Sequence, residues 1–186
     1  MNLKNKTFIS MLRGINVSGQ KDIRMTELQS LYESLNFSDV RTYVQSGNVI
    51  FGSKEGDASK LTGMVESKIK KSFGYQVSVL IKEPKYFKKI IENCPFLTKR
   101  NEDISSLYVT FLYGRPSKLS ISSLNVTNNS GDEFNLGDEE IFIFCPNGYG
   151  RTKLNNNFFE RKLKMPATTR NWKTVISLYK MATGEL

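Results

Sequence analysis

The side chains best suited to chemistry stand in glycine-containing loops. Arg13 and Asn16 share the first of these loops with Gly14 and Gly19, between an apolar segment and a helical pattern. Backbone N–H groups and the start of a helix both attract anions, so such a loop suits a phosphate group. The G-x-x-x-x-G spacing matches a nucleotide-binding P-loop, but the Lys-Ser or Lys-Thr pair of that motif is missing. A turn that needs its glycines for backbone geometry explains the pattern equally well.

A second loop begins at Pro146 and carries two cations, Arg151 and Lys153, beside glycines. A helical pattern covers residues 153–163, so both cations are expected at the start of a helix. Positive charge at that position opposes the helix dipole unless an anion is present. The sequence therefore predicts Arg151 and Lys153 as ligands of an anion.

A third polar stretch, residues 167–172, precedes the last helical pattern of the chain. Thr169 is the expected N-cap of this helix, which places Arg170 and Asn171 in its first turn. Trp172 is the first apolar residue of the helix face, and we expect it in the core. The alternative is that its indole N–H points into a pocket.

The absence of histidine restricts the chemistry most. It excludes Ser-His-Asp and Cys-His nucleophile systems and metal sites built on imidazole. Cys94 and Cys145 lack the spacing of a zinc or redox motif, and we expect both as buried free thiols. We predict no metal and no cofactor, and an enzyme of this composition would need Asp, Glu, Lys or Tyr for proton transfer.

The charge of the chain is +9 and is spread unevenly. Residues 101–145 sum to −5, whereas residues 54–100 and 146–186 each sum to +6. A uniformly basic nucleic-acid binder would not carry such an acidic segment, and basic helix faces are often only solvated. No apolar run approaches the roughly 18 residues of a membrane span, and no signal-peptide core follows the N-terminus. We expect a cytoplasmic protein without a membrane partner.

The elements of the first half follow a regular order. A capping-box pattern at residues 26–29 indicates a helix start, Gly74 a helix end, and the pair Gly47-Asn48 a tight hairpin turn. Apolar periodicity predicts strands at 7–12, 40–44, 49–51 and 77–82 and helices at 28–35 and 58–73. The order β-α-β-β-α-β is the ferredoxin-like signature.

This topology brings two loops together. The loop after the first strand and the hairpin between the second and third strands leave the sheet at the same end. Arg13 and Asn16 should therefore lie near Gln45, Ser46 and Asn48. These side chains offer many hydrogen-bond donors and no strong general base, a set suited to holding a ligand rather than cleaving it.

The second half repeats the order imperfectly. Pro84 is expected to open a helix and Pro95 to end it. Further elements are predicted at 107–113, 118–124, 134–136, 140–145, 153–163 and 170–181, which gives β-α-β-β-α with an extra helix. We predict an α+β protein of two ferredoxin-like (α-β plait) halves packed together, residues 1–82 and 83–186. Each half is expected to have a mainly antiparallel sheet with helices on one face.

Four motifs resemble the bacterial DUF1697 family, at residues 12–17, 42–49, 148–154 and 167–172. The resemblance covers about residues 7–181. It implies a ferredoxin-like fold, and it brings no established activity, substrate or catalytic residue. Cys145 stands where this family usually has tyrosine before the proline of the third motif, so a pocket lined by that ring would differ here.

The leading hypothesis is a binding protein for a small anionic, phosphate-containing ligand. The predicted ligand-binding residues are Arg13, Asn16, Gln45, Ser46, Asn48, Arg151, Lys153, Thr169, Arg170 and Asn171. We expect the four motifs to converge, with Arg13 and Arg170 within roughly 15 Å of the hairpin turn, about the span of a ligand pocket.

Three alternatives stay open. One is an enzyme that uses lysine or carboxylate chemistry at the same place. Another is a nucleic-acid-binding plait, with weak and salt-dependent binding, although residues 47–51 lack the paired aromatics that stack bases. The last is a structural or interaction module of unknown oligomeric state.

Overall fold

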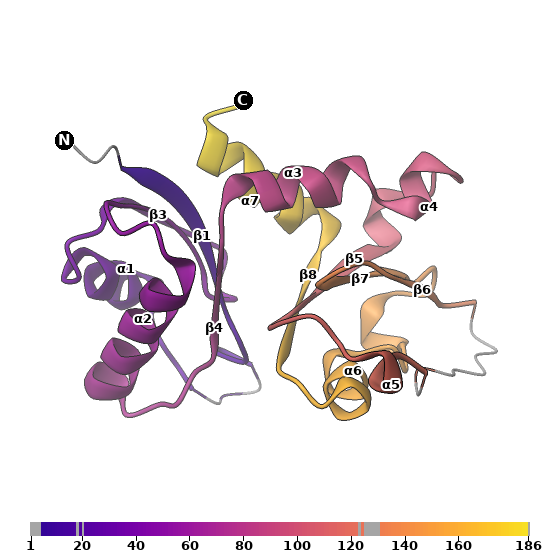
Figure 1. Ribbon diagram of the computed structural model, residues 1–186, viewed down its shortest axis with the longest axis horizontal. Helices are drawn as coiled ribbons and strands as arrows, with labels where there is room; N and C mark the ends of the chain where they lie inside the picture. The colour runs from indigo at the N-terminus through magenta and orange to yellow at the C-terminus, as the bar shows by residue number, and fades with distance from the viewer. Residues whose placement is uncertain (1–4, 18, 20, 123, 125–130, 186) are drawn as a thin grey trace. The chain divides into compact units, whose positions relative to one another are not determined.

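The computed structural model describes residues 5–17, 19, 21–122, 124 and 131–185 (Figure 1). The chain forms two compact units. The first unit combines residues 1–88 with residues 177–186, and the second contains residues 89–176.

The first unit is a four-stranded antiparallel sheet with the strand order β2-β3-β1-β4. Its elements are β1 (Lys6–Leu12), α1 (Met25–Glu33), β2 (Ser38–Tyr43), β3 (Asn48–Ser53), α2 (Ala58–Phe73) and β4 (Val79–Lys82). This order confirms the predicted ferredoxin-like arrangement of the first half.

The core of the first unit lies between the sheet and the two helices. Alternate residues of a strand point to opposite faces, and Phe8 of β1 and Phe51 of β3 share the face that packs against α1 and α2. Their rings stack with centroids 5.7 Å apart. The buried hydroxyls of Ser10 and Tyr32 are 2.7 Å apart in the same core, so each has a hydrogen-bond partner.

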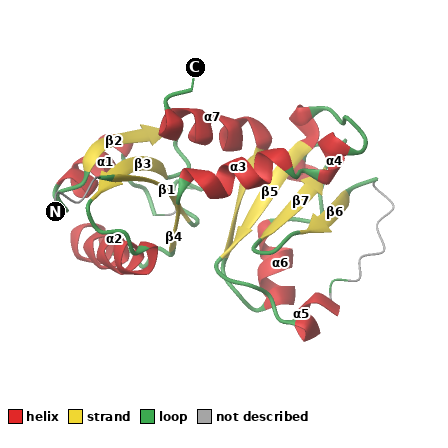
Figure 2. Ribbon diagram, turned by 45° about the horizontal axis from the view of Figure 1, so that its top comes forward, coloured by secondary structure: helices red, strands yellow, loops and turns green. Residues whose placement is uncertain are grey.

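The other face of this sheet meets the end of the last helix, α7 (Trp172–Thr183). Figure 2 shows the C-terminal end of α7 near β2. Arg41 of β2 donates to the carbonyl oxygen of Met181 at 2.6 Å, and the Tyr43 hydroxyl donates to Ser177 Oγ at 3.0 Å. These bonds hold residues 177–186 in the first unit.

The second unit repeats the topology of the first. Its sheet has the order β6-β7-β5-β8, again antiparallel throughout. The elements of the repeat are β5 (Leu107–Leu112), α5 (Lys118–Ser122), β6 (Glu133–Leu136), β7 (Glu140–Phe144), α6 (Asn156–Leu163) and β8 (Ala167–Asn171). They are preceded by α3 (Pro84–Glu92), α4 (Pro95–Thr98) and a 3-10 turn, Ile104–Ser106.

The strand β8 corrects the sequence-based interpretation of residues 167–171. Thr169 pairs with Thr110 in the middle of this strand and does not cap a helix. Asn171 is the cap, because its Oδ1 accepts a hydrogen bond from Thr174 N at 2.7 Å. Trp172 begins α7 and is 1% exposed, which confirms its expected place in the core.

Two boundaries in the first unit also differ from expectation. α1 begins at Met25 after Arg24, with no side-chain cap, so the capping-box prediction at Thr26 was wrong. Four turn residues, 44–47, join β2 to β3, and Asn48 is already the first residue of β3. The predicted hairpin is present, but its turn ends at Gly47, one residue earlier than expected.

Two helices of the second half start at other residues than predicted. Pro95 opens α4 instead of ending the preceding helix, because a proline fits the first turn of a helix, where its missing N–H would have no partner. α6 begins at Asn156 after the N-cap Asn155, whose Oδ1 accepts from Phe158 N at 3.0 Å.

The core of the second unit contains Leu112, Ile141, Ile143, Phe159 and Leu163. Both cysteines are free and buried, as predicted. Burial raises the pKa of the Cys94 thiol and raises that of Cys145 to about 11, so neither is a reactive thiolate at neutral pH. In the described part of the chain, no helix is long and apolar enough to cross a bilayer.

Candidate functional site

In the first unit, the predicted meeting of the β1 loop and the β2–β3 hairpin is confirmed. Asn16 Nδ2 donates to the carbonyl oxygens of Gln45, at 2.8 Å, and of Ile23, at 3.0 Å. Its Oδ1 accepts from Ile23 N at 2.8 Å. All three bonds go to backbone groups, so this amide holds the loop in shape, and Asn16 adopts a positive φ of 54° there.

Asn48 has a comparable role in the hairpin. Its side chain is fully buried, and Nδ2 donates to Tyr43 O at 3.1 Å and to Ser46 Oγ at 2.9 Å. Gln45 is exposed beside it, and Arg13 is half-buried in the neighbouring loop. Of the predicted ligands in this unit, the two asparagines are thus occupied by the protein itself.

Gly47 locks the hairpin against the β1 loop. Its carbonyl oxygen accepts from Leu12 N at 2.8 Å, and its φ is +72°. A Cβ at this position would lie 2.7 Å from Ile15 Cδ1 and 2.8 Å from Leu12 Cβ. Both the backbone conformation and the close approach therefore require glycine here.

In the second unit, the structure brings two of the predicted motifs together around Thr169. The Tyr149 hydroxyl donates to Thr169 Oγ1 at 3.1 Å, and Thr110 Oγ1 lies 2.8 Å from the same atom. Thr169 also bonds to Asn156 Oδ1 at 3.3 Å. Burial, above all, raises the pKa of Tyr149, so the phenol stays protonated and acts as a donor. The ring of Tyr108 packs on that of Tyr149 at 4.7 Å.

Arg151 and Lys153 lie before α6 and not at its start. Arg151 ends a 3-10 turn, Tyr149–Arg151, and Lys153 follows in the loop. The helix-dipole argument for these two cations was therefore wrong. Both side chains are exposed and form no hydrogen bond or ion pair with any residue that the structure describes. Thr152 between them is buried and donates to Asp132 Oδ2 at 2.7 Å.

Arg170 is only 7% exposed. Its Nη1 donates to Thr168 Oγ1 at 2.7 Å and to Thr169 O at 2.9 Å. Burial lowers the pKa of the guanidinium to about 10, and Tyr113 opposes this shift. Arg170 points away from the sheet face that carries the Thr169 hydroxyl, because neighbouring residues of a strand face opposite sides.

The residues predicted from the sequence thus form separate groups within the two units. Arg13, Asn16, Gln45, Ser46 and Asn48 belong to one end of the first sheet, and the other five belong to the second unit. That these residues bind a ligand stays a prediction, and so does their convergence on one site.

A pocket of about 560 Å³ between α5 and α6 was missed by the sequence analysis. Its wall contains three cations, Arg115, Lys162 and Lys164, and no carboxylate among the lining residues that the structure describes. Three serine hydroxyls and three apolar side chains complete it: Ser117, Ser120, Ser122, Leu119, Leu163 and Met165.

Local structure explains how these groups reach the pocket. Lys162 lies in the last turn of α6, and Lys164 is its C-cap in a left-handed conformation, with φ 54°. Cations are favourable at this end of a helix. Ser117 Oγ bonds to Ser120 Oγ at 2.9 Å in the first turn of α5. Arg115 and Lys164 make no hydrogen bond or ion pair within the described residues.

Arg115 is nevertheless not electrostatically isolated. It helps lower the pKa of Asp138, although the hydrogen bond from Lys89 is the main cause of that shift. The sequence carried one signal for this pocket, the basic run at residues 161–164, but nothing in it joined that run to residues 115–122.

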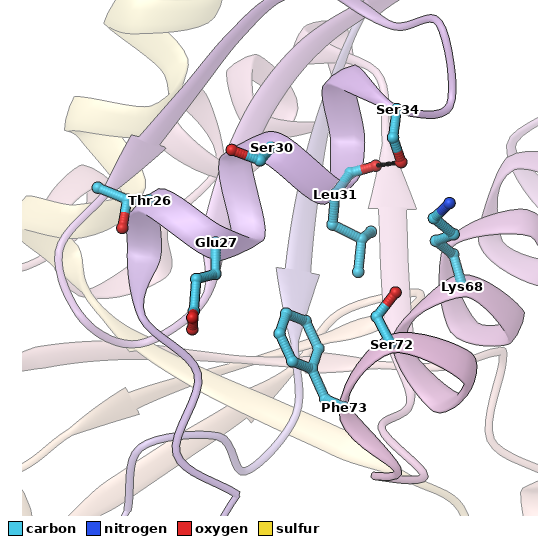
Figure 3. Close-up of a pocket in the computed structure, with 8 residues that line it drawn as sticks. All are labelled: Thr26, Glu27, Ser30, Leu31, Ser34, Lys68, Ser72 and Phe73. Atoms are coloured by element: carbon cyan, nitrogen blue, oxygen red, sulfur yellow. Dashed lines mark hydrogen bonds between the residues drawn. The ribbon is translucent and has the colours of Figure 1, made fainter.

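Two further pockets differ in their charge. One, of about 700 Å³, lies in the second unit and mixes Lys89 and Lys99 with acidic side chains, including the buried Glu140. The other, of about 460 Å³, is a groove between α1 and α2. Figure 3 shows Leu31 and Phe73 of this groove between Glu27 and Lys68, the acid and the base among its described lining residues.

Metal ligands do not gather in any of these places. Across the residues with a described position, no three histidine, cysteine or carboxylate side chains come close enough to hold a metal ion. None of the contacts described above indicates a catalytic residue.

Comparison with known proteins gives a family and a fold. The family model described as a protein of unknown function (DUF1697) matches residues 6–142. No curated protein matches the chain. A solved structure of a conserved bacterial protein from Streptococcus pneumoniae is similar, with a TM-score of 0.74 and 24% identity over 96% of this chain and 99% of that one. At this identity the likeness supports the fold alone.

Proposed function

The chain belongs to the DUF1697 family of proteins of unknown function, and we propose that it is a binding protein for a small phosphate-containing anion held between α5 and α6. The observation that carries the proposal is the pocket wall, whose described residues include three cations, three hydroxyls and no carboxylate. Like charges repel one another across a concave surface, and an anionic occupant removes that repulsion.

The individual side chains match a phosphate group. Arg115 offers a planar fork of donors that fits two phosphate oxygens at once, whereas Lys162 and Lys164 act as point charges. Ser120 Oγ donates to Ser117 O at 2.9 Å and Ser122 Oγ donates to Leu119 O at 2.8 Å, so these hydroxyls would turn away from α5 to donate to the remaining phosphate oxygens. The volume of 560 Å³ falls within the roughly 300–1,000 Å³ of ligand pockets.

The loop with Arg151 and Lys153 is the rival location for the anion. Its cations are exposed and form no ion pair within the described residues, and they were the ligands expected from the sequence. The loop is not part of the pocket between α5 and α6. Substitutions in the pocket and substitutions in the loop therefore distinguish the two possible locations of the anion.

Calorimetric titration with inorganic phosphate tests the proposal. The double variant Arg115→Gln, Lys164→Asn should weaken binding about a hundredfold, since each charge-assisted hydrogen bond is worth ~1.5–3 kcal/mol. Asparagine suits position 164 because it tolerates the left-handed conformation found there. Arg161→Gln is the matched control, since it removes one charge from the exposed surface of the same helix, outside the pocket.

Thermal unfolding gives a second readout of the same binding. Phosphate at a hundredfold excess over Kd should stabilise the wild type by ~2.7 kcal/mol, which raises Tm by about 5–10 °C for a chain of this size. The variant Arg151→Ala, Lys153→Ala should keep this shift. Loss of the shift in that variant would move the site to the loop, and a wild type without any shift would overturn the proposal.

A further inference from the structure

We infer that the anion bound between α5 and α6 carries an apolar group next to its phosphate. This inference rests on the proposed function and names the class of ligand, an amphipathic phosphomonoester. It follows from three properties of the pocket: its apolar wall, its size, and an exposed leucine at its edge.

The apolar wall continues the core of the second unit. Leu163 is 3% exposed and belongs to the same cluster as Phe159, and Met165 packs against that cluster. Both side chains line the pocket together with Lys162 and Lys164. Charged and apolar groups thus alternate along residues 162–165, so an occupant meets both kinds of surface.

The size of the pocket exceeds the need of a phosphate ion. If each heavy atom takes about the 30 Å³ that a water molecule occupies in the liquid, the five atoms of phosphate fill about a quarter of the 560 Å³. The remaining volume is bounded in part by Leu119, Leu163 and Met165. An alkyl or aryl group attached to the phosphate would fill it and be removed from water.

Leu119 is the most exposed of the three apolar residues that line the pocket. This residue is 83% exposed, more than any other large hydrophobic residue in the described part of the chain. Ile121, on the same short helix, is 36% exposed and does not line the pocket. These two residues make a matched pair, because both can be changed without opening the core.

Methyl phosphate and hexyl phosphate, titrated separately into the full chain, test the inference. Both carry the same charged group, and they differ by five methylenes. A fully buried methylene strengthens binding about fourfold, so even partial burial of five should make hexyl phosphate at least about tenfold tighter. Equal affinity for the two esters would overturn the inference and leave the proposed function standing.

The variant Leu119→Ser tests whether the tighter binding of hexyl phosphate arises in this pocket. Leu119→Ser should remove most of the advantage of hexyl phosphate while the affinity for methyl phosphate stays unchanged. Ile121→Ser should leave both affinities as in the wild type. A loss of affinity for both esters in Leu119→Ser, or an equal effect of Ile121→Ser, would overturn the assignment. Failure of both esters to bind would overturn the proposed function itself.

A free phosphate ester and a lipid headgroup both present a phosphate next to an apolar group. An experiment with lipid vesicles distinguishes the two ligands. Sedimentation with phosphatidylcholine vesicles that contain phosphatidic acid should leave the protein in solution when hexyl phosphate binds as a free ligand. Cosedimentation that Leu119→Ser abolishes, without any binding of hexyl phosphate, would overturn the free ester in favour of a membrane lipid.

Discussion

The two units have the same topology and the same kind of groove, yet the grooves differ in charge. Each sheet places its first and third strands at equivalent positions, in the orders β2-β3-β1-β4 and β6-β7-β5-β8. In the first unit, the described lining of the groove between α1 and α2 contains one acid and one base, Glu27 and Lys68. In the second, the pocket between α5 and α6 carries only bases among its described lining residues.

The difference shows that the fold provides a groove between two helices and that the side chains lining it determine which ligand can bind there. A balanced pair such as Glu27 and Lys68 leaves no net field for an ion. The helices differ in length as well: α1 and α2 have 9 and 16 residues, and α5 and α6 have 5 and 8.

A second contrast concerns the loops that the sequence indicated as sites. In the first unit, Asn16 and Asn48 hold backbone groups in place, and Gly47 allows the two loops to touch. In the second unit, Arg151 and Lys153 stand exposed. Asn16, Asn48 and Gly47 therefore have structural roles in the first unit, whereas Arg151 and Lys153 make no such contacts with described residues of the second.

The largest expected effect tests the structural role of the first loop pair. Gly47→Ala should destabilise the protein by about 2–4 kcal/mol, because it adds a strained left-handed conformation to a steric clash with Leu12 and Ile15. Gly14→Ala is the control, since φ is +65° there and nothing lies within 4 Å of the added Cβ. It should cost only ~1 kcal/mol. Urea unfolding measures both, and equal costs would contradict the close approach.

A smaller effect should appear in the second unit at alkaline pH. The pKa of Cys145 is raised to about 11, so the folded thiol keeps a proton that the unfolded thiol releases above about pH 9. The resulting stabilisation is present below pH 9 and is lost as the pH rises through 11. Relative to Cys145→Ala, the wild type should lose about 1–2 kcal/mol of unfolding free energy across this window.

Urea unfolding of both proteins at pH 8, 9, 10 and 11 checks this prediction. Comparing the two chains cancels the titration of lysines and tyrosines that both share. A difference in unfolding free energy that stays constant from pH 8 to 11 would show that Cys145 is not held protonated by its surroundings.

The smallest expected effect sharpens the comparison of the grooves. Glu27→Lys replaces the acid of the first unit's groove by a second base. The affinity of this groove for phosphate should stay weak but rise about two- to fivefold over that of the wild type. Exposed ion pairs contribute ~0.2–1 kcal/mol, which sets this range. The control is Glu33→Lys, the same charge change on the same helix outside the groove.

Phosphate titrations of this variant are best made in the Arg115→Gln, Lys164→Asn background, where the pocket between α5 and α6 is expected to bind phosphate about a hundredfold more weakly. If Glu27→Lys and Glu33→Lys strengthen binding equally, net charge alone explains the gain. The position of the charge within a groove would then not matter.

Much of the first unit could be predicted because its signals are local. α2 has Asp57 as N-cap, an apolar stripe at Leu61, Val65 and Ile69, and Gly74 in a left-handed C-cap. Each of these features depends on neighbours within one or two helical turns. The meeting of Asn16 with the hairpin then followed from the ferredoxin-like order of the strands.

The strand β8 could not be predicted in the same way. Its sequence is polar, and it passes into α7 at Trp172 without a loop, so the helical pattern of the following residues extended backwards over it. Pairing with β5 makes it a strand, through contacts between residues about 60 positions apart. Burial of Arg170 is likewise a consequence of that pairing.

By itself, the sequence determined the class of the fold, the order of most elements, the buried thiols and the absence of histidine chemistry, because composition and short-range periodicity encode these properties. The tertiary structure decided which polar residues hold the backbone and which face a pocket. Arg115 and Lys164 are 49 positions apart in the chain and line one wall only because α5 packs against α6. Such a neighbourhood arises from long-range packing, and no local pattern of residues records it.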